Sequence, residues 1–179
     1  MAEDLTIRPM TRPELDTLVE WAAQEGWNPG LNDADIFWHT DPDAFIAAES
    51  GGRLIGGGSI VSYAGRFGFM GFFIMHPEWR GRGLGDRLWH HRRDTLLARL
   101  SPPKVIGMDG VFNMQAYYAK GGFQFFGRDL RFEGVGEAAP TPSRIVPLST
   151  VPFEQVLAYD SAHFPAPRAN FLRRWIAQP

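Results

Sequence analysis

The sequence lacks cysteine entirely over its 179 residues. A chain without cysteine cannot form disulfides, use a thiolate as a nucleophile or hold zinc through cysteine ligands. It also lacks a strong charge of either sign, since 18 lysines and arginines against 20 aspartates and glutamates leave a net charge of −2. This balance supplies no broad basic field, so we expect no nucleic acid among its partners.

Long apolar runs are missing as well. The longest, "FGFMGFFIM" at residues 67–75, has nine residues, far fewer than the roughly 20 that a membrane-spanning helix needs. The first residues, "MAEDLTIRPM", are acidic and have no apolar centre, unlike a secretion signal. We therefore expect a soluble, cytoplasmic protein without a membrane partner. The oligomeric state stays open, a homodimer being one option.

Apolar residues are nevertheless abundant enough for a core, at 44% hydrophobic and 13% aromatic. The length suits one domain of ordinary size with a remainder. Residues 5–10 predict a first strand. Thr11 and Glu14 then form a capping-box pattern that starts a helix ending at about Glu25. A second, shorter helix is expected at residues 33–39.

Glycine marks the elements that follow. Two runs of strand-forming residues, 44–50 and 53–63, flank Gly51-Gly52 and predict a hairpin. Gly56–Gly58 inside the second run indicate a β-bulge or a close approach of another group to the backbone. Residues 67–75 are apolar without alternation, which is typical of a strand buried on both faces.

Helix and strand patterns alternate over the next fifty residues. A helix begins near Leu84, and the sequence then predicts a strand at 104–110, a short helix at 113–120 and a final strand pair at 123–127 and 130–134. The elements together predict an α/β (α+β) fold, with a mixed sheet of about seven strands flanked by about four helices.

The composition changes at residues 135–143, "VGEAAPTPS", which we interpret as a linker between a domain at 1–134 and an extension at 144–179. The extension's "RIVPLSTVPFEQV" resembles the chain's "TIRPMTRPELDTL", and a true repeat and a coincidence both fit this match. A helical pattern, Phe171, Leu172, Trp175 and Ile176, closes the chain. The extension is too short to bury its own core. It packs on the first domain or on a partner, or it begins a second domain that is incomplete.

The segment "RGRGLG", residues 80–85, lies between a predicted strand and a predicted helix and suggests a phosphate site. It is not a P-loop, because no Lys-Ser/Thr pair follows its last glycine, and Asp86 replaces the third glycine of a dinucleotide loop. Two interpretations remain, a helix start whose free N–H groups hold a pyrophosphate and a plain turn. In the helix that follows, Leu84 and Leu88 share an apolar face into which Arg92 also falls.

These pieces together resemble the GNAT family of N-acetyltransferases. "RGRGLG" is similar to the family's R/Q-x-x-G-x-G/A signature, with the strand "GFFIMHP" before it, and "YYAKGGF" is similar to the family's Y-x-K-x-G-F ending. The resemblance covers residues 5–134. "EGWNPG", "DGVF" and "FPAPRANFLRRWI" look similar to bacterial two-domain members with a second acetyltransferase-like half.

The resemblance implies a GNAT-like acyl-CoA N-acyltransferase fold with a mostly antiparallel sheet. It implies an enzyme that transfers an acetyl group from acetyl-CoA to a primary amine of a small molecule, by direct attack and without a metal. The pyrophosphate would lie on Arg80, Gly81, Arg82, Gly83, Leu84 and Gly85. Backbone groups of Phe73, Ile74 and Met75 would hold the pantetheine, and an N–H near Ile74 would polarise the thioester carbonyl.

Tyr118 matches the tyrosine that serves as the acid in this family, with Tyr117 as the less favoured neighbour. The general base is not fixed, because residues 68–75 contain no Asp or Glu. Asp109, at the carboxyl end of a predicted strand, is the first candidate for the base. Glu25, acting through a water molecule, is the second.

Candidates for the acceptor pocket come from the first helices and the loop between them: Trp27, Asn28, Phe37, Trp38 and His39. An aromatic wall with few charges indicates a small or partly apolar amine. His90 and His91 point about 100° apart on a helix and make a poor metal pair. Two other functions stay open, a non-catalytic acyl-CoA-binding or interaction module and a protein or peptide N-acetyltransferase.

Overall fold

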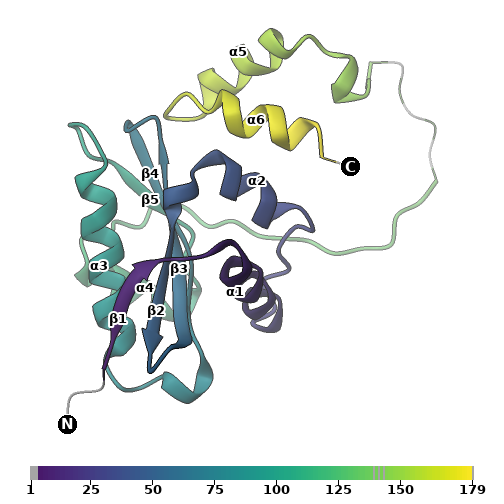
Figure 1. Cartoon of the computed structure of the whole chain (residues 1–179). Coiled ribbons are helices and arrows are strands. Elements are labelled where there is room, and N and C mark those ends of the chain that lie inside the picture. The colour runs from purple at the N-terminus through teal and green to yellow at the C-terminus, as the bar shows by residue number, and fades with distance from the viewer. Residues whose placement is uncertain (1–3, 139, 141, 143, 179) are drawn as a thin grey trace.

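The computed structural model describes residues 4–138, 140, 142 and 144–178. Its centre is a sheet in the order β1-β2-β3-β4-β5 (Figure 1). The strands are β1 (Thr6–Pro9), β2 (Phe45–Ser50), β3 (Arg53–Tyr63), β4 (Phe67–Met75) and β5 (Ile106–Met108). Neighbours from β1 to β4 run antiparallel, and β4 pairs with β5 in parallel. The mixed, mostly antiparallel sheet expected from the sequence is confirmed.

The last strand, β5, pairs with only the first part of β4. It is shorter than the predicted strand 104–110, and its residues pair only with Gly68, Phe69 and Met70 of β4. Within the described chain, no strand lies beside residues 71–75 on that side. The sheet is therefore open between its last two strands, and the cavity described below is lined by this part of β4.

Helices cover both faces of the sheet (Figure 1). On one face, α1 (Arg12–Gln24) and α2 (Asp33–Thr40) pack against the strands, with Leu15 and Leu18 of α1 fully buried. On the other face, α3 (Leu84–Ala98) and α4 (Gln115–Lys120) bury a second apolar cluster. The periodic apolar residues that predicted these helices are the ones that meet the sheet.

The triple glycine of β3 has both of the explanations left open by the sequence. The register against β4 shifts between Gly57 and Ser59, which marks a bulge. A Cβ placed on Gly56, Gly57 or Gly58 would lie 2.4 Å from Met75 Sδ, 2.5 Å from Met10 Cε or 2.2 Å from Arg92 Cζ. The three glycines therefore let side chains from both faces of the sheet approach β3.

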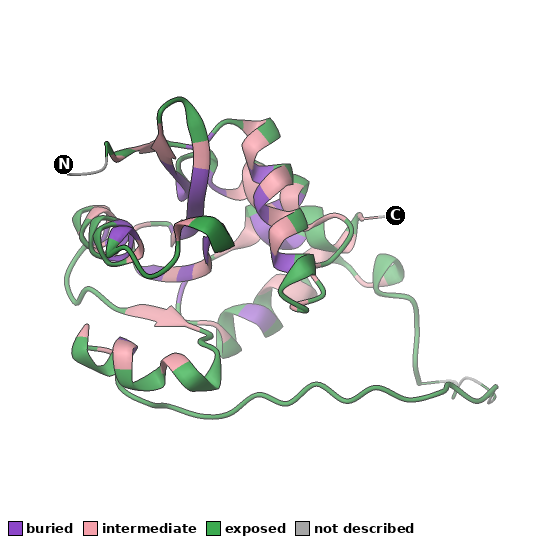
Figure 2. Ribbon diagram, turned by 90° about the horizontal axis from the view of Figure 1, so that it is seen from below, coloured by how far each residue is buried: buried purple, intermediate pink, exposed green. Residues whose placement is uncertain are grey.

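The predicted final strand pair at 123–127 and 130–134 is wrong. Neither segment forms a strand, and every described residue from Gln124 to Thr150 is exposed (Figure 2). The described sheet thus has five strands and not about seven. Strand-forming residues stabilise a strand only where a face can be buried against a neighbour, and the described part of the chain supplies none for these aromatic side chains.

The extension folds into α5 (Phe153–His163) and α6 (Ala169–Ile176), and α6 lies beside α2 (Figure 1). Phe171 and Leu172 form a small buried cluster with Ile36 of α2. The segment around Ile145, which the repeat matches to the first strand, is irregular and forms no strand. The expected linker at 135–143 contains positions 139, 141 and 143, which lie outside the described residues. None of the described helices is both long enough and apolar enough for a transmembrane segment.

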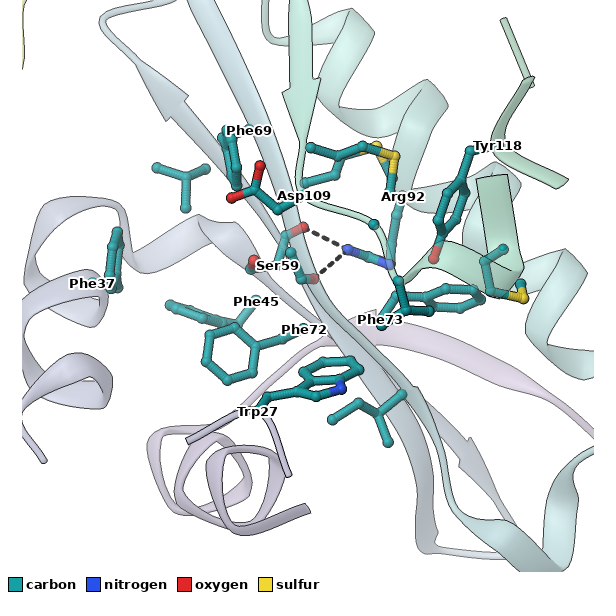
Figure 3. Close-up of a pocket in the computed structure, with 18 of the residues that line it drawn as sticks. Trp27, Phe37, Phe45, Ser59, Phe69, Phe72, Phe73, Arg92, Asp109 and Tyr118 are labelled. Carbon is teal, nitrogen blue, oxygen red and sulfur yellow. Dashed lines mark hydrogen bonds between the residues drawn. The ribbon is translucent and has the colours of Figure 1, made fainter. Parts of the chain in front are cut away.

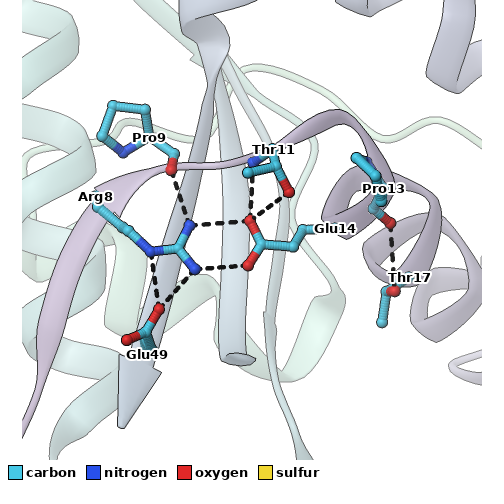
Figure 4. A network of polar contacts seen from close by, with 7 residues as sticks. All are labelled: Arg8, Pro9, Thr11, Pro13, Glu14, Thr17 and Glu49. Carbon is cyan, nitrogen blue, oxygen red and sulfur yellow. Dashed lines mark hydrogen bonds and ion pairs between the residues drawn. The ribbon is translucent and has the colours of Figure 1, made fainter. Parts of the chain in front are cut away.

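One ionic network ties β1 and β2 to the start of α1 (Figure 4). The Arg8 guanidinium donates to both carboxylate oxygens of Glu14, at 2.6 and 2.9 Å, and to Glu49 Oε2 at 2.6 and 2.9 Å. Glu14 also accepts the backbone N–H of Thr11 at 2.8 Å, as the predicted capping box requires. These hydrogen bonds lower the pKa of Glu14 from 4.5 to about 2, and the contact with Arg8 has the largest effect.

This depressed pKa predicts how stability changes with pH. The stabilisation by ionised Glu14 is complete above the unfolded-state pKa of 4.5 and is lost as pH falls through about 2. Because solvent reaches the network, we expect Glu14→Gln to cost only about 1 kcal/mol at neutral pH. Urea unfolding at a series of pH values should show the difference between the variant and the wild type shrinking below pH 4.5.

Glu20→Gln is the matched control, because this exposed carboxylate on the same helix contacts Gln24 and lies outside the Arg8 network. It should leave the pH dependence of stability unchanged. A Glu14→Gln difference that persisted in full at pH 2 would contradict an electrostatic origin.

Candidate functional site

The glycine loop between β4 and α3 has a backbone that only glycine adopts easily. Gly81 and Gly83 have φ angles of +74° and +76°, in the left-handed region. Gly83 is also the N-cap of α3, so the free N–H groups of the first helical turn lie at the loop. Neither glycine has other atoms near the position of a Cβ. The loop borders a hollow of about 210 Å³ that is open to a ligand.

Two arginines around the loop contact neighbouring residues. Arg80 donates from Nε to the Met75 carbonyl oxygen at 2.8 Å and forms an ion pair with Glu25. The guanidinium of Arg82 lies over the Trp79 ring, 4.9 Å from its centroid. Arg80 therefore links the end of β4 to α1, so the charge it presents at the loop is partly neutralised.

An acid also lies at the start of α3. Asp86 accepts a hydrogen bond from the Tyr117 hydroxyl at 2.8 Å. Both residues line the hollow at the glycine loop. Tyr117, the less favoured candidate for the acid, is thus hydrogen bonded at the start of α3 beside the loop.

A β-bulge reshapes the open end of β4. Gly57 pairs with Ile74 and Ser59 pairs with Gly71, so Phe72 and Phe73 together oppose a single residue of β3. Phe72 has a φ of +49°, an uncommon conformation for a bulky residue. A bulge takes a residue out of the ladder and redirects the backbone. Part of the backbone proposed to hold pantetheine is therefore released from the sheet.

A large cavity of about 810 Å³ opens at this bulge. It shares Phe73, Met75, Arg80 and Met114 with the hollow at the glycine loop, so the two spaces adjoin. Aromatic side chains dominate the part shown in Figure 3, among them Trp27, Phe37, Phe45, Phe69, Phe72 and Phe73. Polar groups lie among them, including Asp109, Tyr118 and Arg92 (Figure 3).

The proposed acid and base both line this cavity. Tyr118 packs against Gly110, where a Cβ would lie 2.6 Å from Tyr118 Cε2, and Gly110 directly follows Asp109. Burial raises the pKa of the Asp109 carboxyl, and the negative charge of Asp129 raises it further. Burial likewise raises the pKa of the Tyr118 phenol, while the positive charge of Arg92 lowers it. At neutral pH Tyr118 therefore holds its proton.

The acceptor candidates divide into two groups. Trp27 and Phe37 line the cavity. Asn28 has a φ of +48° in the loop after α1 and does not line it. Trp38 is partly buried against the core and does not line the cavity; its ring stacks on that of Phe45 with centroids 6.0 Å apart. His39 accepts a hydrogen bond from Asn170 through its carbonyl oxygen and also lies outside the lining.

Several lining residues were not foreseen from the sequence. Phe164, Arg168 and Phe171 come from the extension and line one wall of the cavity. The Phe164 ring packs edge-on against Tyr63 and Phe67, with centroids 5.0 and 5.5 Å away. No local pattern in the sequence indicates such a contact over a hundred residues. Arg92 did give a signal, a charge on an apolar helix face.

No group of three or more histidine, aspartate or glutamate side chains is arranged to hold a metal in the described part of the chain. Tyr118, Asp109 and Arg92 are ionisable groups that line the cavity beside β4. Proton transfer and stabilisation of negative charge are the steps that these groups can perform.

Several known proteins resemble this chain in sequence or in fold. The chain is 27% identical to the holothin acyltransferase of a Pseudoalteromonas species over 173 residues. This alignment covers 96% of this chain and 57% of that protein. A putative acetyltransferase from Pyrococcus horikoshii has a similar fold, with a TM-score of 0.67, 18% identity, and coverage of 96% of this chain and 61% of that one.

An N-acetylglutamate synthase from Neisseria gonorrhoeae, solved with coenzyme A and N-acetyl-glutamate, is similar over 69% of this chain and 29% of its own, with a TM-score of 0.53 and 19% identity. In the comparison with the holothin acyltransferase, the chain spans little more than half the length of that protein. The model of the acetyltransferase (GNAT) family matches residues 12–123, and we conclude that this chain belongs to that family.

Proposed function

We propose that the protein is an N-acyltransferase that moves an acetyl group from acetyl-CoA to the primary amine of a small molecule. The continuous space from the glycine loop, past the β4 bulge, to Tyr118 and Asp109 carries this proposal. One end has the backbone of an anion site, and the other has an acid, a base and apolar walls. Both substrates could therefore meet at the bulge.

The donor end fits coenzyme A by its shape and by its backbone. The open left-handed glycines Gly81 and Gly83 allow a pyrophosphate to approach the N–H groups at the start of α3. Phe73, Ile74 and Met75 line the adjoining cavity, where their backbone groups would hold pantetheine. The thioester supplies an acetyl group that is activated toward amines.

The reaction requires two proton movements. The amine nitrogen bonds to the carbonyl carbon, the carbon–sulfur bond breaks, the nitrogen loses a proton and the sulfur gains one. A raised pKa suits Asp109 for accepting the amine proton near neutral pH. Tyr118 holds its proton at that pH and can donate it to the sulfur.

The walls of the acceptor end favour a small, apolar amine. Glu25 and Asp109 are the acidic residues of the lining, and Glu25 is paired with Arg80. A peptide acetyltransferase needs an open acidic groove for lysine side chains. Here Phe164 and Phe171 of the extension cover one wall. The name of the holothin acyltransferase gives one compound as its acceptor, which agrees with a small-molecule substrate.

The first prediction concerns the glycine loop. Gly83→Ala places a Cβ on a residue with φ +76° and strains the first turn of α3, so we expect acetyl-CoA affinity to fall about tenfold. Gly52→Ala is the control, because Gly52 has φ +77° and equally open space in the turn between β2 and β3. Calorimetry should show reduced affinity for the first variant only. Equal affinity in both variants would remove the loop from the donor site.

The second prediction concerns the acceptor. In a panel of amines with detection of free coenzyme A thiol, aryl-alkyl primary amines should release thiol faster than lysine peptides, because the cavity walls are apolar. Faster turnover of peptides would favour a peptide acetyltransferase. Binding of acetyl-CoA without release for any amine would favour a non-catalytic module.

The third prediction concerns the proton donor. Tyr118→Phe removes the hydroxyl and keeps the ring that packs on Gly110, so kcat should fall about 100-fold while acetyl-CoA affinity changes little. Tyr159→Phe, an exposed tyrosine of α5, should leave both unchanged. A parallel loss of kcat and affinity in Tyr118→Phe would instead assign this tyrosine a structural role.

A further inference from the structure

Arg92 is a charged residue where the sequence pattern of α3 calls for an apolar one. Its side chain is only 1% exposed. One nitrogen, Nη2, donates to two carbonyl oxygens, that of Ser59 in β3 at 2.7 Å and that of Gly71 in β4 at 2.6 Å. Arg92 therefore clamps the two strands directly beside the bulge (Figure 3).

The clamp depends on Gly58. A Cβ on Gly58 would lie 2.2 Å from Arg92 Cζ and 2.5 Å from Nε. Only glycine leaves room for a guanidinium at this point of β3. The glycine at position 58 of β3 thus makes room for the arginine at position 92 of α3.

The guanidinium is poorly compensated for a buried cation. Its Nε and Nη1 have no hydrogen-bond partner, and no carboxylate forms an ion pair with it within the described chain. The Phe73 ring, 5.3 Å from Cζ, offsets part of the cost by a cation–π contact. Burial lowers the pKa of Arg92, yet arginine keeps its proton at neutral pH.

Stability alone does not account for this arrangement. A buried charge with incomplete compensation is costly, and replacing such a group by an apolar residue of similar size is often neutral or stabilising. The place of the charge offers another explanation. Arg92 lines the cavity together with Tyr118 and Phe73, at the end where the donor thioester would lie.

We propose that Arg92 is a positioning residue for acyl transfer, which fixes the bulged backbone of β4 and holds a positive charge beside Tyr118. This inference rests on the proposed function. The two hydrogen bonds to carbonyl oxygens hold the strands beside Phe72 and Phe73, which both line the cavity. The fixed charge favours the negative charge that forms on the thioester oxygen and then on the sulfur.

Few titratable groups interact with the pair formed by Arg92 and Tyr118. Tyr118 from α4 faces Arg92 from α3, and the two interact electrostatically. Asp109, after β5, lies in the same cavity. Tyr117 of α4 couples to Tyr118 and is hydrogen bonded to Asp86 of α3. Of these, Arg92 is the group that opposes the effect of burial on Tyr118.

The first test needs no acceptor. Arg92→Met removes the charge and keeps the side-chain volume. In an alkaline ultraviolet titration, the tyrosine signal that Tyr118→Phe abolishes should then have its midpoint about one pH unit higher than in the wild type. Arg92→Lys should keep most of the wild-type midpoint. Circular dichroism at each pH confirms that the fold persists.

The second test is kinetic. Arg92→Met should lower kcat about 100-fold with KM for acetyl-CoA within about twofold, and Arg92→Lys should recover part of kcat. Arg99→Met is the matched control, since Arg99, at the end of the same helix, pairs with buried Asp41 away from the cavity. It should lower thermal stability and leave both the Tyr118 midpoint and kcat unchanged. If Arg92→Met does not fold, Arg92→Gln keeps a donor for the carbonyls without the charge.

The two readouts separate the possible failures. An unchanged Tyr118 midpoint in the neutral variants would overturn the inference, as would a loss of kcat matched by Arg99→Met. A wild type that releases no coenzyme A with any amine would overturn the proposed function. The titration would still decide whether Arg92 sets the charge at Tyr118.

Discussion

A buried guanidinium sets the geometry of the two central strands at the point where the sheet opens. Arg92 reaches from α3 into the space left by Gly58 and binds the carbonyl oxygens of Ser59 and Gly71. Because these carbonyls flank the bulge, the same contact that joins α3 to the sheet also fixes the backbone of β4 at Phe72. The glycine loop follows five residues after the end of β4, so its position depends on this geometry as well.

The cavity results from several elements that end or turn away at one place. β5 stops after pairing with Met70, β4 bulges just beyond it, and α4 brings Tyr118 to the resulting space. Phe164 of the extension then adds part of a wall. Only a few polar groups remain in this apolar space, and burial raises the pKa values of Asp109 and Tyr118. A mostly apolar, aromatic surrounding strengthens each remaining charge and hydrogen bond.

Much of the fold could be predicted because local signals agreed with long-range packing. The capping pattern at Thr11, the hairpin glycines and the apolar face of α3 each correspond to an element of the structure. The prediction failed at residues 123–134, where strand-forming residues such as Phe125 and Phe126 stay exposed. Propensity indicates what a segment can form, and only a neighbouring strand decides whether it does.

For the site, the sequence by itself determined where the glycine loop lies and gave the family resemblance. The alternating glycines of "RGRGLG" permit a left-handed backbone before a helix, and Gly81 and Gly83 adopt it. Tertiary structure alone decided which side chains share the cavity. It placed Trp27 in the lining and Trp38 outside it, and it brought Phe164 and Arg168 to a wall formed by residues about a hundred positions away. A backbone conformation depends on residues adjacent in sequence, whereas the walls of a cavity depend on how distant helices pack.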